Sequence, residues 1–205
     1  MLDIIKWFLY AFTFSLFIFG LMTDSLINIL NGLKSIMISR NILITDYFLV
    51  GGIGASFINA ALLTFICLFL IQITKTKITG SGIAAIFSVS GFALFGKNLV
   101  NVWFMFLGVI IYTLIKREKI SDHLYSAFFG MAMAPLTSEF IFSKWLPLET
   151  GIILSIVVGI FTGLIIVPLS RYFYRFHQGY CLYNTGLTAG LITTIIISIM
   201  RSDIV

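Results

Sequence analysis

The stretch GSGIAAIFSVSGFALFGKN, residues 80–98, decides how many times this chain can cross a membrane. Its apolar part, residues 80–95, is rich in small side chains and ends at Gly96-Lys97-Asn98. A helix needs roughly 20 apolar residues to cross a hydrocarbon core of about 30 Å, so this run can barely span one. We therefore expect either a short or broken span or a re-entrant half-helix. A re-entrant run would reverse the orientation of every later segment.

The composition around this stretch is that of an integral membrane protein. Of the 205 residues, 60% are hydrophobic and only 10% are charged, and the mean hydropathy is +1.09. A soluble domain carries about 25% charged residues, so a surface this apolar requires lipid as its solvent. The apolar runs are continuous and about 20 residues long, which is the length of a spanning helix rather than of an alternating barrel strand. The sequence predicts an all-α integral membrane protein.

Six or seven hydrophobic segments follow one another and leave no room for a soluble domain. We expect a single transmembrane domain over residues 1–205, either whole or one half of a duplicated architecture, with one or two segments re-entrant or broken. Residues 23–46 carry leucine and isoleucine at helical spacing beside asparagine and lysine, which predicts an amphipathic interfacial connection. The predicted segments are residues 4–22, 47–73, 80–95, 99–115, 123–142, 148–169 and 179–200.

Basic residues between the apolar runs set the predicted orientation. Cytoplasmic loops of membrane proteins carry an excess of lysine and arginine. With seven crossings, one side holds eight of the thirteen basic residues, which predicts a bacterial plasma-membrane protein with its N-terminus in the cytoplasm. The richer side collects Lys6, Lys75, Lys77, Lys116, Arg117, Lys119, Arg171 and Arg175, and the other side collects Lys34, Arg40, Lys97, Lys144 and Arg201.

Several function classes lack their characteristic residues. The net charge of +5 comes from these loop clusters, so it does not indicate nucleic-acid binding. Cys67 and Cys181 both lie in apolar runs, which predicts neither a disulfide nor a metal site. The sequence holds no His-Glu-x-x-His pair, no Gly-x-Ser-x-Gly nucleophile and no aspartate pair, so we expect no enzyme and no cofactor. The expected partners are the lipid bilayer, a small polar solute or ion, and further copies of the chain in a homo-oligomer.

A polar stretch opens the last apolar run, where residues 177–190 read HQGYCLYNTGLTAG. Polar groups in hydrocarbon are costly unless they are paired or face water. Tight helix packing explains the glycines about as well as a broken helix that exposes backbone groups to a solute. An intramembrane amide needs a partner, which favours a functional role for Asn184 and its neighbours Tyr183 and Thr185. Residues 54–62 weakly echo residues 179–187, with Asn59 at the position of Asn184.

Two further breaks place charge within apolar sequence. Lys97 and Asn98 lie between two runs, where the lysine either snorkels to an interface or attracts an anion at the break of a discontinuous helix. Pro135 frees a backbone carbonyl one turn earlier, and Thr137 and Ser138 can help to satisfy it. Glu139 is either a solvated interfacial residue or, at depth, a protonated or paired group that could couple to protons or cations.

These motifs carry a family resemblance. Residues 95–98, 134–139 and 179–190 resemble a family of bacterial membrane proteins, found in clostridia and their relatives, that is classed as a domain of unknown function. The resemblance covers most of the chain and implies a membrane location and a multi-helix fold. Longer members of the family contain about two copies of this set of helices, which implies that this chain corresponds to one copy. Residues 179–190 are more distantly similar to a Gly-Tyr-Asn-like element of urea transporters, but Cys181 replaces the asparagine, which counts against urea.

We expect a transporter or channel-like protein that moves a small polar or ionic solute through its helix bundle. The first alternative is a substrate-binding membrane subunit of a multisubunit importer, which would co-purify with an ATPase pair. The second is a non-transporting assembly or sensor protein, in which the helices close around Asn184 without a polar cavity. The candidate residues for the solute pathway are Asn59, Lys97, Asn98, Thr137, Glu139, Tyr183, Asn184 and Thr185.

Overall fold

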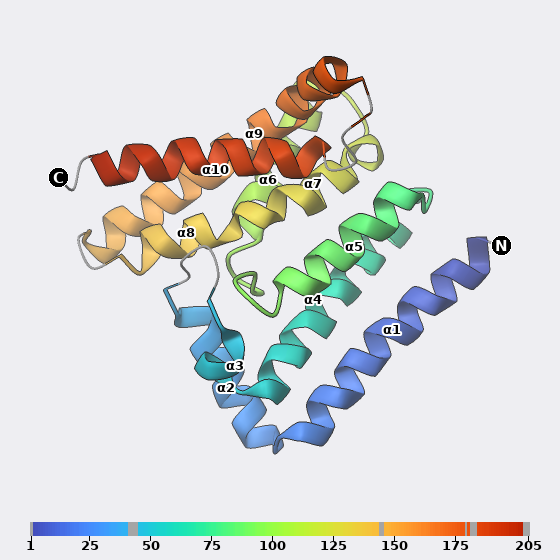
Figure 1. Cartoon of the computed structure of the whole chain (residues 1–205), viewed down its shortest axis with the longest axis vertical. Helices are drawn as coiled ribbons and strands as arrows, with labels where there is room; N and C mark the ends of the chain where they lie inside the picture. Colours follow the sequence, from blue (N-terminus) through green and yellow to red (C-terminus); the bar gives the residue numbers. More distant parts are fainter. Residues whose placement is uncertain (1, 41–44, 144–145, 179, 181–183, 203–205) are drawn as a thin grey trace.

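The computed structural model describes the chain except for residues 1, 41–44, 144–145, 179, 181–183 and 203–205. Every regular element within the described residues is helical (Figure 1). Three helices are long and apolar enough to cross a membrane, namely α1 (Leu2–Thr23), α4 (Ile53–Ile73) and α9 (Leu148–His177). Shorter apolar helices complete the bundle, so the predicted all-helical, membrane-capable fold is confirmed.

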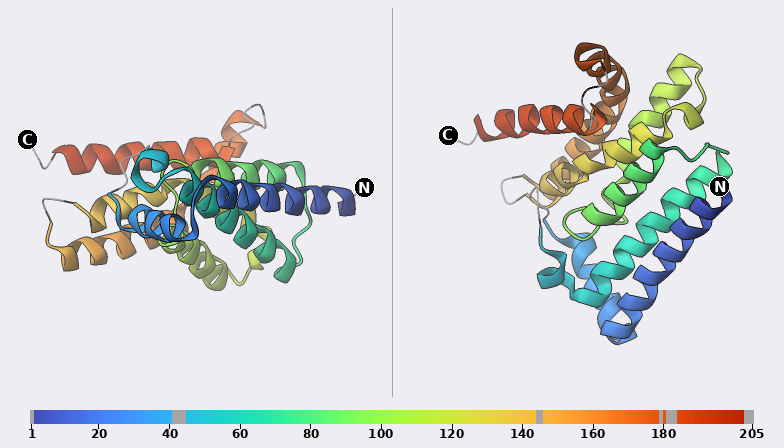
Figure 2. Two further views of the ribbon diagram at one scale, coloured as in Figure 1. Left: turned by 90° about the horizontal axis from the view of Figure 1, so that it is seen from below. Right: turned by 45° about the vertical axis from the view of Figure 1, so that its right-hand side comes forward.

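The N-terminal part is built on α1 and α4, which pack side by side (Figures 1 and 2). The connection between them contains α2 (Leu26–Ile38), an amphipathic helix that packs against α4 and buries Ile29 and Ile36 on one face. Apolar contacts with α4 therefore hold this connection in place.

Residues 47–73 do not form the single helix that the sequence predicts. They divide into α3 (Tyr47–Gly51) and α4 because Gly52 has a φ of 87°, a left-handed conformation that glycine adopts without steric cost. The Asp46 carboxylate caps α3 by accepting a hydrogen bond from Phe48 N at 2.9 Å. The break brings Tyr47 into the bundle, where its side chain is fully buried.

Residues 80–98 belong to a helical hairpin. α5 (Gly80–Phe92) has 13 residues and α6 (Trp103–Lys116) has 14, so each is shorter than a full crossing. Residues 93–102 turn the chain within the bundle, and α6 leads back toward the end at which α5 began (Figures 1 and 2). The segment that follows α6 is tied to the start of α5, because Tyr125 OH donates a hydrogen bond of 2.6 Å to Lys77 O. The two short runs therefore form one hairpin of short helices rather than two full-length helices.

The hairpin returns the chain toward the end of the bundle from which it entered, and the orientation of the later segments in a membrane stays a prediction. The basic loops agree with this path, since Lys6 and Lys77 line one cavity and Arg171 pairs with Glu118 at 3.2 Å. Lys97, which seven crossings would place in a loop on the opposite side, is instead buried at the hairpin tip.

A broken helix follows the hairpin. η1 (Ile120–Asp122) leads into α7 (Leu124–Gly130), and the short 3₁₀ turn η2 (Met131–Met133) joins α7 to α8 (Ala134–Ile141). Pro135 lies in the first turn of α8, where its missing N–H costs no helical hydrogen bond. The interruption predicted within residues 123–142 is therefore present.

The last two helices enclose the bundle from one side (Figure 1). α9 continues through Pro168 to His177, beyond the predicted end at residue 169, and α10 is Asn184–Ser202. α9 packs closely against α6 through glycines. A Cβ added to Gly108 would lie only 2.8 Å from Gly163 Cα, so side chains at these positions would force the two helices apart.

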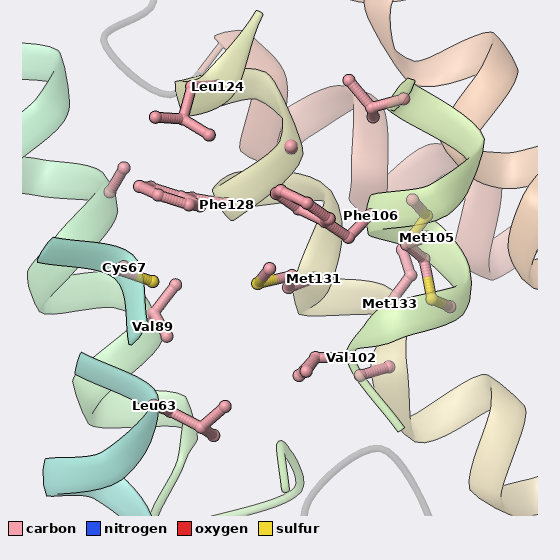
Figure 3. Packing of buried hydrophobic residues seen from close by; sticks show 14 of the residues in the cluster. Leu63, Cys67, Val89, Val102, Met105, Phe106, Leu124, Phe128, Met131 and Met133 are labelled. Atoms are coloured by element: carbon pink, nitrogen blue, oxygen red, sulfur yellow. The ribbon is translucent and has the colours of Figure 1, made fainter. Parts of the chain in front are cut away.

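An apolar core fills the space between α4 and the hairpin, α7 and η2 (Figure 3). Cys67 of α4, Val89 of α5, Met105 of α6 and Phe128 of α7 are all fully buried in it. Cys67 is a free thiol, whereas Cys181 lies outside the described residues. This core holds the two arms of the hairpin in place and so positions its tip.

Candidate functional site

Two asparagines hold the tip of the α5–α6 hairpin, residues 93–102, as non-helical backbone. Asn98 Oδ1 accepts hydrogen bonds from Val100 N at 2.9 Å and from Asn101 N at 3.0 Å. Asn101 Oδ1 accepts one from Asn98 N at 2.9 Å. The side chains thus satisfy N–H groups that a helix would have bonded, as irregular backbone inside an apolar bundle requires.

Hydrogen bonds from two asparagine side chains, one on α4 and one on the tip itself, connect the tip to the N-terminal helices. Asn59, in the middle of α4, donates from Nδ2 to Ala93 O at 2.7 Å and to Lys97 O at 2.8 Å. Asn98 Nδ2 donates to Ile36 O, in the last turn of α2, at 3.2 Å. Both asparagine side chains are fully buried. The amide predicted in the middle of the second segment therefore has its partners in the hairpin.

The tip also bonds to α8 and α3. Asn101 Nδ2 donates to Ser138 Oγ at 2.9 Å, and Thr137 Oγ1 donates to Asn101 O at 3.2 Å. Asn98 Nδ2 donates to Tyr47 OH at 3.3 Å. The candidate list from the sequence contains Asn98 and Thr137 but omits the other three. The spacing of Asn98 and Asn101 was the available signal, because side chains three residues apart can close a turn on each other's backbone.

Lys97 brings a positive charge to this tip. Only 1% of the residue is exposed, and its Nζ has no hydrogen-bond partner among the described residues. Nζ lies 5.1 Å from the centroid of the Phe92 ring, a cation–π contact. Asn59 Oδ1 is a second buried polar atom without a hydrogen bond in the described part of the chain. The burial of Lys97 at the tip argues against snorkelling and leaves an ammonium that needs an anion or an acceptor.

Lys97 is among the residues that line a half-open cavity of about 770 Å³ between the hairpin, the broken helix and α10. Small-molecule sites typically have volumes of roughly 300–1,000 Å³. Most of the wall is apolar and includes Phe92, Phe129, Met133 and Ala189. Lys97 is the single charged side chain among the described lining residues. The cavity is therefore large enough for a small molecule and has one ionisable side chain among its described lining residues.

Glu139 is paired, with a partner distant in sequence. Arg40, which follows α2, donates from Nε at 2.9 Å and from Nη2 to the two carboxylate oxygens of Glu139. The hydrogen bonding to Glu139 raises the pKa of Arg40 above its ordinary value. Glu139 is therefore paired, and its depth in a membrane stays a prediction. The pair fastens the segment after α2 to α8, and Glu139 does not line the cavity beside Lys97.

Asn184 and Thr185 lie at the start of α10 and line a second, polar cavity of about 370 Å³. Asn184 Nδ2 donates to Ser170 O on α9 at 2.6 Å, so this amide has a partner. Tyr183 lies outside the described residues, as does part of the segment that echoes residues 54–62. The predicted candidates therefore divide between two places, the hairpin tip and the start of α10.

His123 and Arg171 line the second cavity and belong to a charged cluster that no sequence motif indicated. His123, only 4% exposed, hydrogen-bonds through Nε2 with the carboxylate of Glu118, and Arg171 Nη2 lies 3.2 Å from the same carboxylate. The hydrogen bond with His123, and after it the contact with Arg171, lowers the pKa of Glu118. The cluster joins the end of α6 to α9, and its members are too far apart in sequence for local spacing to reveal it.

The fold and the site together define a class: an all-helical, membrane-capable protein in which a half-length helical hairpin presents a buried lysine to a cavity. The chain belongs to the family described as Protein of unknown function (DUF1576), whose model matches residues 25–202. The family resemblance seen in the motifs is thereby confirmed. No curated protein and no solved structure matches the chain, so the similarity to urea transporters gains no support.

Proposed function

We propose that this protein is a multi-pass transporter or channel of the bacterial plasma membrane, with its N-terminus in the cytoplasm, and that it binds a small polar or ionic solute at the tip of the α5–α6 hairpin. The observation that carries the proposal is Lys97, whose buried ammonium lacks a hydrogen-bond partner among the described residues and lines a cavity of about 770 Å³. Basic loops gathered at one end of the bundle support the orientation.

The energetics of Lys97 favour a ligand over a purely structural role. Insertion of a lysine at the centre of a membrane helix costs about 2.5–3.5 kcal/mol, and removal of a partner from a buried charge costs more. Packing alone would be better served by an apolar side chain. A solute that supplies an acceptor to Nζ would offset this cost only while it is bound, as a binding site requires.

The asparagines of the tip have a positioning role in this proposal. Asn98 and Asn101 fix the non-helical backbone, and Asn59 bonds the carbonyl oxygen of Lys97 itself. Thr137 bonds the tip from the opposite side. The solute would therefore meet a lysine whose backbone is held from two sides, near the breaks of two discontinuous segments and without a cofactor.

The test is solute flux into proteoliposomes that contain the purified full-length chain. Stopped-flow vesicle swelling is measured with urea, glycerol, chloride, methanesulfonate and benzenesulfonate, with valinomycin present for the potassium salts. We expect at least one solute to enter about tenfold faster than into empty vesicles. Lys97→Met should remove the increase, and Lys34→Met, a matched change at an exposed lysine of α2, should keep it. Equal rates with and without protein, or full flux in Lys97→Met, would overturn the proposal.

A substrate-binding subunit of a multisubunit importer is the second candidate, because the same cavity could capture a solute without passing it. This candidate predicts binding without flux and co-purification with an ATPase pair. The polar cavity lined by Asn184 and Thr185 counts against the third candidate, a closed packing protein, which requires helices that meet around Asn184 without a polar void.

A further inference from the structure

Building on the proposed function, we infer that the solute is an amphiphilic organic monoanion, with one acidic group that pairs with Lys97 Nζ and an apolar body that lies along the cavity wall. A neutral polar solute or a bare inorganic anion would fit the proposed function but not this inference. Lys97 favours the acidic group of the solute, and the apolar lining of the cavity favours its apolar body.

The charge that we infer for the solute follows from Lys97, the one charged side chain among the described residues that line the cavity. Nζ of Lys97 is buried and has no hydrogen-bond acceptor among the described residues. Among the described residues that line the cavity, no aspartate, glutamate or second cation accompanies it. In its protonated form this one lysine, with apolar surroundings, favours one negative charge on the ligand, since a cation would be repelled and a dianion would keep an unpaired charge.

The apolar body is set by the wall. The Phe92 ring lies 5.1 Å from Lys97 Nζ, and Phe95, Phe129 and Met133 also line the cavity. A bare inorganic anion would reach the ammonium and leave this apolar surface without a partner. Burial of an aromatic group against such surface contributes at about 25 cal/mol per Å², enough for at least a tenfold gain in affinity.

The far wall is formed by α10 and is lined by hydroxyls rather than by charges. Thr193 and Ser198 face the cavity there, opposite Ser88 of α5. Gly190 also lines the cavity, and a Cβ at this position would meet no atom within 4 Å. A large side chain at Gly190 would therefore fill cavity space without displacing the protein around it.

Binding by the full-length chain in phosphatidylcholine nanodiscs tests the inference, because detergent would bring an apolar chain of its own. Isothermal titration compares benzenesulfonate with methanesulfonate, which lacks the ring, and with benzenesulfonamide, which lacks the charge. We expect benzenesulfonate to bind at least about tenfold more tightly than either of the others. Lys97→Met should abolish this preference for the charged ring compound.

A matched pair of glycine variants tests the location. Gly190→Phe should weaken benzenesulfonate binding at least about tenfold by filling the cavity. Gly91→Phe, on α5, places the same side chain where a Cβ also meets no atom within 4 Å and where the cavity is not lined, so binding should be unchanged. Equal weakening by both variants would contradict the assigned cavity.

The outcomes separate this inference from the proposed function. Flux or binding of urea, chloride or methanesulfonate that equals or exceeds that of benzenesulfonate would overturn the amphiphilic anion while leaving the transporter proposal standing. Loss of benzenesulfonate binding when anionic phosphatidylglycerol is added to the nanodiscs would show that a lipid headgroup supplies the anion, which also overturns the inference. No binding of benzenesulfonate by the wild type would overturn it directly.

Discussion

Replacement of Asn101 by leucine should destabilise the fold by about 3–5 kcal/mol. The Asn101 side chain is 1% exposed and makes three hydrogen bonds, to Gly96 O, Ser138 Oγ and Asn98 N, at 2.8–2.9 Å. Side-chain hydrogen bonds inside membrane proteins average about 0.6 kcal/mol, so their loss accounts for about 2 kcal/mol. The buried N–H of Asn98, left without an acceptor, adds about 1–3 kcal/mol. Leucine has nearly the same shape, so packing changes contribute little.

The assay is unfolding of the purified protein by sodium dodecyl sulfate in mixed micelles, followed by tryptophan fluorescence. Trp103 is a suitable reporter because its indole Nε1 donates to Leu99 O at the base of the tip, at 2.6 Å. The matched control is Asn31→Leu on an exposed position of α2, which should change the free energy of unfolding by less than about 0.5 kcal/mol. A loss below about 1 kcal/mol for Asn101→Leu, or a loss of equal size in the control, would refute the structural role assigned to the tip.

Three further results are expected. A double-mutant cycle on Arg40 and Glu139, with alanine at each, should give a coupling of about 0.5–1 kcal/mol, because the pair is only partly buried, and a zero coupling in chemical denaturation would contradict the pairing. The pKa of Glu118 is lowered in the folded state, so its ionised carboxylate stabilises the fold fully above about pH 4.5. This stabilisation is lost as the pH falls through the folded pKa. In a plot of unfolding midpoint against pH, the decrease on the acid side should therefore be shallower in Glu118→Gln. Gly163→Ala should destabilise by about 1–3 kcal/mol because its Cβ would overlap the backbone of α6, whereas Gly190→Ala should be neutral or stabilise by up to about 1 kcal/mol, and thermal unfolding that ranks the two in the opposite order would refute the packing.

Composition and run length were sufficient to predict the helical, membrane-capable fold, because continuous apolar runs near 20 residues admit few other structures. The same rule misjudged the fourth run. Leu99 and Val102 are apolar, so hydropathy alone includes them in that run. The hydrogen bonds of Asn98 and Asn101 instead hold residues 99–102 in the tip, and α6 begins only at Trp103. Hydropathy reflects the polarity of the side chains only. It does not show that the side chains of Asn98 and Asn101 accept hydrogen bonds from the backbone and so prevent a helix here.

The candidate site was predictable in part. Asn59, Lys97, Asn98 and Thr137 were selected because polar groups in apolar runs need partners, and the structure brings them to one hairpin tip. The partner of Glu139 was not predictable, since Arg40 lies 99 residues earlier and local spacing carries no information over that distance.

The hydrogen bonds between the hairpin tip and α8 have a consequence for biogenesis. Asn101 cannot find Ser138 until 37 further residues have left the ribosome and the broken helix has entered the bundle. Until then the tip would hold amides and an ammonium in lipid without their final neighbours. The hairpin should therefore remain near the insertion machinery, or near water, until α8 arrives, and truncation of the nascent chain before that helix should leave residues 93–102 open to digestion or chemical labelling.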